Sequence, residues 1–144
     1  FNLPLENSKL EDYFIEFNKK EDLELFIISN GLIKTIPSTF TLSAKNRILL
    51  SPEIFNDDAL IFKNINSREI SIGNTKTDYK LKLTNTGNAP HLGLWAKPGA
   101  PYVCIEPWHG HADMVDSDKN FIKKDNIIEL SAGESFSSSY EIEV

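Results

Sequence analysis

The sequence predicts an all-β fold of antiparallel strands. Short apolar or alternating stretches recur along the whole chain and are broken by Gly, Pro, Asn and Asp at close intervals, as is typical of antiparallel sheets. A chain of 144 residues with 40% hydrophobic content can bury one core of ordinary size and is short for two. We therefore expect a single β-sandwich domain over 1–144.

The clearest strand is 79–83, where Tyr79, Leu81 and Leu83 share one face and two lysines share the other. The last segment, 136–144, repeats this alternation, and Ala132-Gly133 predicts a hairpin turn that joins it to a strand at 127–130. Asn30-Gly31 predicts a second hairpin, because both residues accept a positive φ. Further strands are expected at 13–17, 23–28, 32–36, 47–50, 59–63, 68–72, 91–95 and 101–106.

Composition narrows the possible partners. The net charge of -6 and the scattered, mostly Lys, basic residues disfavour nucleic acid, and no clustered Arg predicts a phosphate clamp. The single cysteine, Cys104, cannot form an internal disulfide, which favours the cytoplasm. No apolar run approaches the roughly 20 residues of a membrane helix, so we expect no membrane partner.

The residues from Trp95 to Asp113 contain the densest candidate chemistry. Glu106 follows an apolar strand and precedes a proline, so we expect it at a strand end that faces a cleft. Partial burial there would raise its pKa toward the range of a general base. The pattern leaves open the alternative of an edge glutamate that points to water.

Two tryptophans flank this carboxylate in sequence. A hairpin of 91–95 with 101–106 would bring Trp95 and Trp108 to one rim, where indole faces suit the C–H side of a sugar ring, although ordinary packing is the alternative for each. The pattern His109-x-His111-x-Asp113 suggests a metal site if it continues a strand, but a third or fourth ligand is hard to name. A pocket-lining loop with one histidine bonded to ligand is favoured, so no metal is expected.

The acidic turn at 56–58 is a further candidate, either as a turn or as a source of one side chain for a polyol site. The polar stretch 113–126 is interpreted as a long surface loop.

The segment HLGLWAKPGAPYVCIEPWHGHAD at 91–113 resembles the aldose 1-epimerase, or galactose mutarotase-like, family. Supporting similarities are FNLPL at 1–5, PEIFNDDALIF at 52–62, and the Leu130, Gly133 and Glu134 pattern before the last strand. The resemblance extends over nearly the whole chain. It implies the C-terminal portion of a galactose mutarotase-like super β-sandwich.

By this resemblance the protein interconverts the α and β anomers of a free aldose, an aldohexose, without a cofactor. Family members use a glutamate base and a histidine acid, and the matching base is Glu106. Asp58 matches the substrate-binding aspartate, and Trp95, Trp108 and His109 are expected to contact the sugar. A non-catalytic carbohydrate-binding protein and a sugar-phosphate mutarotase are the alternatives.

One departure from the family pattern concerns the acid. The family's histidine belongs to a His-Pro-x-Phe motif whose last residue matches Phe1, and none of His91, His109 and His111 matches that histidine. We therefore expect the acid upstream of this chain, the chain to be about the C-terminal half of a longer enzyme, and the chain alone to have little activity. The strand edges of such a truncated sandwich are expected to allow a homo-oligomer.

Overall fold

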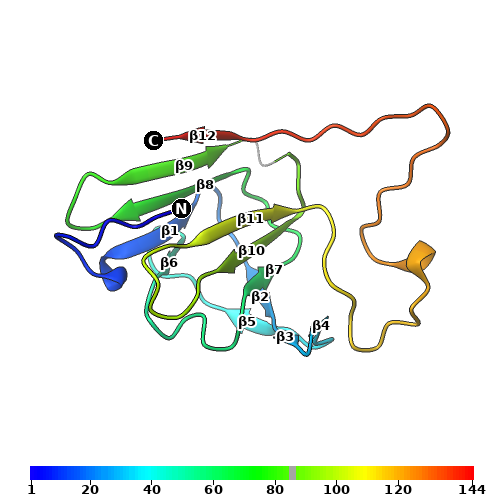
Figure 1. Ribbon diagram of the computed structural model, residues 1–144, viewed down its shortest axis with the longest axis horizontal. Helices are drawn as coiled ribbons and strands as arrows, with labels where there is room; N and C mark the ends of the chain where they lie inside the picture. The colour runs from blue at the N-terminus through cyan, green and yellow to red at the C-terminus, as the bar shows by residue number, and fades with distance from the viewer. Residues whose placement is uncertain (85–86) are drawn as a thin grey trace.

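The computed structural model describes residues 1–84 and 87–144, and these form a sandwich of two antiparallel five-stranded sheets (Figure 1). The first sheet has the order β12 (Glu141–Glu143), β9 (Lys80–Thr84), β8 (Glu69–Asn74), β1 (Tyr13–Phe17) and β6 (Arg47–Leu49). The second has the order β11 (Cys104–Trp108), β10 (His91–Trp95), β7 (Leu60–Phe62), β2 (Leu23–Phe26) and β5 (Ser38–Phe40). The all-β, antiparallel prediction is confirmed.

Four short elements complete the described chain. Strands β3 (Ile28–Ser29) and β4 (Leu32–Ile33) form a hairpin, and η1 (Leu10–Asp12) and η2 (Phe121–Lys123) are single 3-10 turns. No helix within residues 1–84 and 87–144 has the length and apolar character that crossing a membrane would require.

The main core fills the space between the two sheets. Ile70, Ile72 and Leu83 of the first sheet and Phe62 and Leu92 of the second belong to one cluster of buried side chains. Because side chains alternate along a strand, each sheet also has an outer face. On the outer face of the second sheet a smaller apolar cluster gathers, and its members are Phe26, Ile33, Ala59 and Ile61, with Ile28, Trp95, Trp108, Ala112 and Met114 packed against them.

Several predicted strands are found at or near their expected positions. β1 and β10 have the expected bounds, and the Asn30-Gly31 hairpin is confirmed with φ of 52° and 78° at these residues. The hairpin is formed by β3 and β4, and Ile27 separates β3 from β2, so the expected strand 23–28 is divided in two. β5 was not predicted, because its sequence, Ser-Thr-Phe, has little apolar character.

The prediction of a hairpin between 127–130 and 136–144 is wrong. A turn is present at Ser131, where the Glu134 amide donates to the Ser131 carbonyl at 3.0 Å, but 127–130 is not a strand. Only Glu141–Glu143 of the last segment is a strand, and it pairs with β9. The alternation correctly indicates a strand at 141–143, but the strand that pairs with it, β9, lies far away in the sequence.

The expectation that Glu106 ends its strand is also wrong. β11 continues through Pro107 to Trp108, and Glu106 is its central residue. β11 lies at the edge of the second sheet, where a proline is tolerated because a strand there is bonded on one side only. The segment 101–103, expected to be strand, precedes β11.

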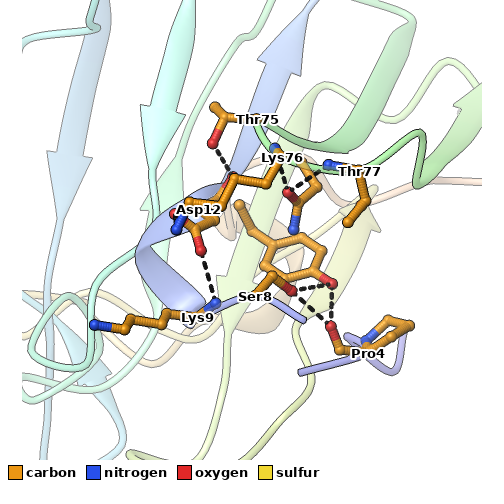
Figure 2. Close-up of polar contacts among 9 residues, drawn as sticks. Pro4, Ser8, Lys9, Asp12, Thr75, Lys76 and Thr77 are labelled. Carbon is orange, nitrogen blue, oxygen red and sulfur yellow. Dashed lines mark hydrogen bonds and ion pairs between the residues drawn. The ribbon is translucent and has the colours of Figure 1, made fainter. Parts of the chain in front are cut away.

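The N-terminal residues close one end of the sandwich. Figure 2 shows Ser8 beside Pro4, and the hydroxyls of Ser8 and of the buried Tyr13 both donate to the Pro4 carbonyl. Asp12 accepts from the Lys9 amide at 2.8 Å, and its own carbonyl accepts from the Thr75 amide at 2.9 Å. These bonds tie residues 4–12 and the turn after β8 to the start of β1.

The buried carboxylate of Glu21 links the two sheets. Glu21 lies just before β2 of the second sheet, and its partners lie just before β8 of the first. It accepts hydrogen bonds from the amides of Asn66 and Ser67, just before β8, and from the Asn66 side chain. We predict that Glu21→Gln lowers the free energy of unfolding by about 2 kcal/mol, because its amide group would face N–H donors that need acceptors. Chemical denaturation measures this change.

The exposed Glu24 of β2 provides the matched control, and Glu24→Gln is expected to change stability by less than about 0.5 kcal/mol. Equal effects of the two substitutions would contradict a role of Glu21 as an acceptor.

Candidate functional site

The paired strands β10 and β11 position the candidate site. His91 lies opposite Trp108, Gly93 opposite Glu106, and Trp95 opposite Cys104. Residues directly opposite each other in an antiparallel pair project from the same face. Because Leu92 and Leu94 belong to the main core, these six residues occupy the outer face of the second sheet.

Glu106 is half-buried at the centre of this face. Opposite it, Gly93 has no side chain, and a Cβ at this position would lie 2.7 Å from Cζ2 of Trp108. The indole of Trp108 therefore covers the Gly93 backbone, directly beside the strand position of Glu106. This contact is not predictable from the sequence, because a glycine in a strand indicates a close approach without identifying the partner.

Trp95 lies at the other end of the strand pair. Its ring centroid is 6.2 Å from that of Tyr102, and it packs against the outer apolar cluster. The two tryptophans thus share the face of Glu106 and lie one on each side of the Gly93–Glu106 pair. Cys104 is on the same face, where burial and the nearby Glu106 carboxylate raise the pKa of its thiol, as suits an unreactive cysteine.

Asp58 lies apart from these residues, at the start of β7. It has a φ of 78°, and its Oδ1 accepts a hydrogen bond from the Ala59 amide at 2.8 Å. Its side chain is exposed and lines a hollow together with Asp57, Ser29 and Lys34. Asp58 lies in the turn before β7, and β10 separates β7 from β11, the strand that carries Glu106.

His109 contacts the C-terminal segment. Its Nε2 is 3.1 Å from the Ser138 hydroxyl, and its ring meets Phe136 edge-on with centroids 4.9 Å apart. His109, His111 and Asp113 do not alternate along a strand, because β11 ends at Trp108. Within the described residues no three His, Cys, Asp or Glu side chains converge to hold a metal ion.

His91 and His111 form a buried pair beside the site. Their ring centroids are 5.2 Å apart, His91 Nδ1 accepts weakly from the Asn64 amide at 3.4 Å, and His111 Nδ1 lies 2.8 Å from the Ala112 carbonyl. The Nε2 atoms of both have no hydrogen-bond partner within the part of the chain that the structure describes. Sequence reasoning missed this pair, because 20 residues separate the two histidines.

Lys63 lies next to this pair, after β7. Its Nζ is 3.4 Å from the Met114 sulfur and 4.7 Å from the centroid of the Phe26 ring. Burial lowers the pKa of Lys63, and the carboxylate of Asp125 partly offsets this effect. Lys63 lies two residues after Ile61 and therefore projects from the same outer face of the second sheet. This placement could have been predicted from the sequence.

Burial, together with the neighbouring His111 and Lys63, lowers the pKa of His91 from 6.5 to about 4. The unfolded chain therefore binds a proton at this residue more readily than the folded chain does. The contribution of neutral His91 to the free energy of unfolding is fully present above about pH 6.5 and is lost as the pH falls toward 4.

We predict a decrease of about 2 kcal/mol in the free energy of unfolding between pH 7.5 and pH 4.5, measured by urea denaturation. In His91→Asn this decrease should be clearly smaller, because the amide retains an acceptor near Nδ1 without titrating. Superimposable pH profiles for the two proteins would contradict the assignment to His91.

The contact of Trp108 with Gly93 generates a second prediction. Gly93→Ala forces the indole to move, so the near-ultraviolet circular dichroism of the protein should change and its stability should fall by about 1–3 kcal/mol. Gly110→Ala is the control, since a Cβ there meets no atom within 4 Å. An unchanged aromatic spectrum in Gly93→Ala would contradict this placement of the indole.

Comparison with known proteins yields two solved structures, while no protein-family model and no curated protein matches the chain. A galactose mutarotase related enzyme from Lactobacillus acidophilus superimposes with a TM-score of 0.86 at 27% sequence identity, over 99% of this chain and 48% of that one. A galactose mutarotase-like protein from Lactobacillus casei ATCC 334 superimposes with a TM-score of 0.77 at 19% identity, with the same coverage.

The chain therefore has the galactose mutarotase-like fold, and the resemblance to this family that the sequence predicted is confirmed. The chain spans about half the length of each of these two proteins.

Proposed function

We propose that the chain is the part of an aldose mutarotase that carries the catalytic base, Glu106. The observation that supports this most is the position of Glu106 on the outer face of the second sheet, with the indole of Trp108 against Gly93 directly opposite. A carboxylate beside an apolar aromatic surface suits a ligand that is polar at its hydroxyls and apolar at its C–H faces. The likeness to a galactose mutarotase related enzyme supports the same substrate class.

The proposed reaction needs one base and one acid. Glu106 accepts the proton of the anomeric hydroxyl while an acid gives a proton to the ring oxygen, and the bond between C1 and the ring oxygen breaks. The product is the open-chain aldehyde. Rotation about the C1–C2 bond followed by the reverse transfers closes the other anomer, and both groups return to their initial protonation states.

The aromatic side chains orient the sugar in this proposal. Trp95 and Trp108, on either side of Glu106, pack against the C–H face of the ring and direct the anomeric hydroxyl to the carboxylate. Asp58 accepts a hydrogen bond from a sugar hydroxyl with the oxygen that the Ala59 amide leaves free. A second sugar hydroxyl takes the place of Ser138 at His109.

The acid comes from a part of the protein outside these 144 residues. His91 and His111 are buried, and this proposal assigns His109 to a sugar hydroxyl, so none of the three is left to protonate the ring oxygen. The share of each structural relative that the chain covers, 48%, is consistent with an acid supplied from elsewhere.

We predict that the 144-residue chain accelerates anomer exchange of galactose very little. A polypeptide that also contains the residues encoded upstream should catalyse exchange, and Glu106→Gln should lower its rate by about 10²- to 10⁴-fold, the usual contribution of a general base. Glu53→Gln, at an exposed turn, is the control. Polarimetry measures the rates.

Galactose binding, measured by tryptophan fluorescence, is compared with the polarimetric rate to separate an enzyme from a protein that only binds sugar. Glu106→Gln should keep galactose binding, and Trp108→Ala should weaken it. Fast exchange by the 144 residues alone would refute the external acid, and full activity of Glu106→Gln would refute the base.

A further inference from the structure

The chain after β11 surrounds a hollow that the proposed reaction does not use. This stretch leaves the end of β11 and makes a wide turn before η2 (Figure 1). It is fixed to β4, because the Ile33 amide donates to the Asp113 carbonyl at 2.8 Å and the Val115 amide donates to the Ile33 carbonyl at 2.9 Å. Lys124 Nζ, 2.7 Å from the Asp113 carboxylate, closes the turn. We call the hollow, which residues of 111–125 line, the loop hollow.

Two buried histidines lie at the inner wall of the loop hollow. His111 lines it and is 8% exposed, and the ring of the fully buried His91 lies against His111 with centroids 5.2 Å apart. The Nε2 atom of each ring is buried and has no hydrogen-bond partner within residues 1–84 and 87–144. Because an unsatisfied buried polar atom is costly, two of them at one place indicate a bound group.

The neighbours of the two rings determine which Nε2 atom has a proton. A backbone amide can only donate, so His91 Nδ1, which accepts from the Asn64 amide at 3.4 Å, is unprotonated and the proton of the neutral ring is on Nε2. A backbone carbonyl can only accept, so His111 Nδ1 donates to the Ala112 carbonyl at 2.8 Å, and Nε2 of the neutral ring has a lone pair. The pair therefore offers one donor and one acceptor.

A hydroxyl group fits this pair of nitrogens. Its oxygen can accept from His91 Nε2 while its proton is donated to His111 Nε2. Hydrogen bonds of about 2.9 Å on each side allow one oxygen to reach both rings. A metal ion fits poorly, because it needs a lone pair on both nitrogens and would be repelled by the neighbouring ammonium group of Lys63.

The charged side chains of the loop hollow disfavour an anion. It is lined by four carboxylates and two ammonium groups, those of Asp113, Asp116, Asp118, Asp125, Lys123 and Lys124. Both lysines are already paired, Lys123 with Asp118 at 3.2 Å and Lys124 with Asp113 at 2.7 Å. An anionic ligand would therefore meet an excess of negative charge, whereas hydroxyl groups can donate to the carboxylates.

We propose that the loop hollow binds a neutral polyol, with one hydroxyl group held between Nε2 of His91 and Nε2 of His111. Its volume of about 370 Å³ is within the usual range of sites for small molecules. His91 lies opposite Trp108, so this site borders the candidate site, but neither Trp108 nor Glu106 lines the loop hollow. The inference goes beyond the proposed function, because binding here involves no proton transfer and no acid.

The test is nuclear magnetic resonance of the histidine side-chain nitrogens, in the polypeptide that also contains the residues encoded upstream. The probe is methyl β-galactoside, a polyol that has no anomeric hydroxyl and so cannot be a substrate at Glu106. At about pH 7.5 we expect the proton on Nε2 in His91 and on Nδ1 in His111, and a saturable shift of both Nε2 signals with the probe. Reversed tautomers or unmoved signals would overturn the proposal.

Two substitutions at one position test the acceptor. His111→Gln keeps an acceptor near the position of Nε2 and should retain the affinity for the probe, whereas His111→Phe keeps a ring without nitrogen and should weaken binding by about tenfold. The His91 Nε2 signal reports binding in both variants, and circular dichroism verifies that both are folded.

Equal affinity of these two variants would contradict the role of His111. A shift of both Nε2 signals by Zn²⁺ at lower concentration than the glycoside would show a metal site instead of a polyol site. Since the probe is not a substrate and the signals report on His91 and His111, the outcome is independent of whether Glu106 is a base.

Discussion

The register between β10 and β11 is the constraint on which the candidate site depends. It places Leu92, Leu94 and Ile105 in the main core, and therefore places Glu106 and Trp108 on the opposite face. A shift of β11 by one residue would exchange the two faces of that strand, burying the Glu106 carboxylate in the core and exposing Ile105. The burial of those apolar residues thus fixes the position of the carboxylate, although Glu106 itself contributes little to the core.

β10 and β11 each contain one residue that weakens a strand, Gly93 and Pro107. Gly93 has no side chain to pack and is conformationally costly in a strand, but its bare backbone receives the indole of Trp108. Pro107 removes a backbone donor, and the edge position of β11 makes that loss tolerable. Local rules of strand composition are broken where the chain builds a surface, a pattern common at functional sites.

Alternation and turn residues were enough to predict the fold class, the bounds of β1 and β10, and the turn at Asn30-Gly31. They failed where the structure depends on distant pairing, as in β12, whose partner is β9, and in β11, which continues through a proline. For the site, the expected hairpin of 91–95 with 101–106 is present as β10 and β11, but it places Trp95 and Trp108 at opposite ends of the strand pair and not at one rim. The pairing of His91 with His111 and the contact of Trp108 with Gly93 are tertiary, and one sequence does not encode them in any local pattern.

The outer face of the second sheet explains why the proposed reaction needs a second group. A sheet face presents its side chains from one side only, so the outer face of the second sheet offers the Glu106 carboxylate and an aromatic surface without enclosing a ligand. General acid–base catalysis on a sugar requires a second group at the ring oxygen and the exclusion of water, which only another layer of polypeptide supplies.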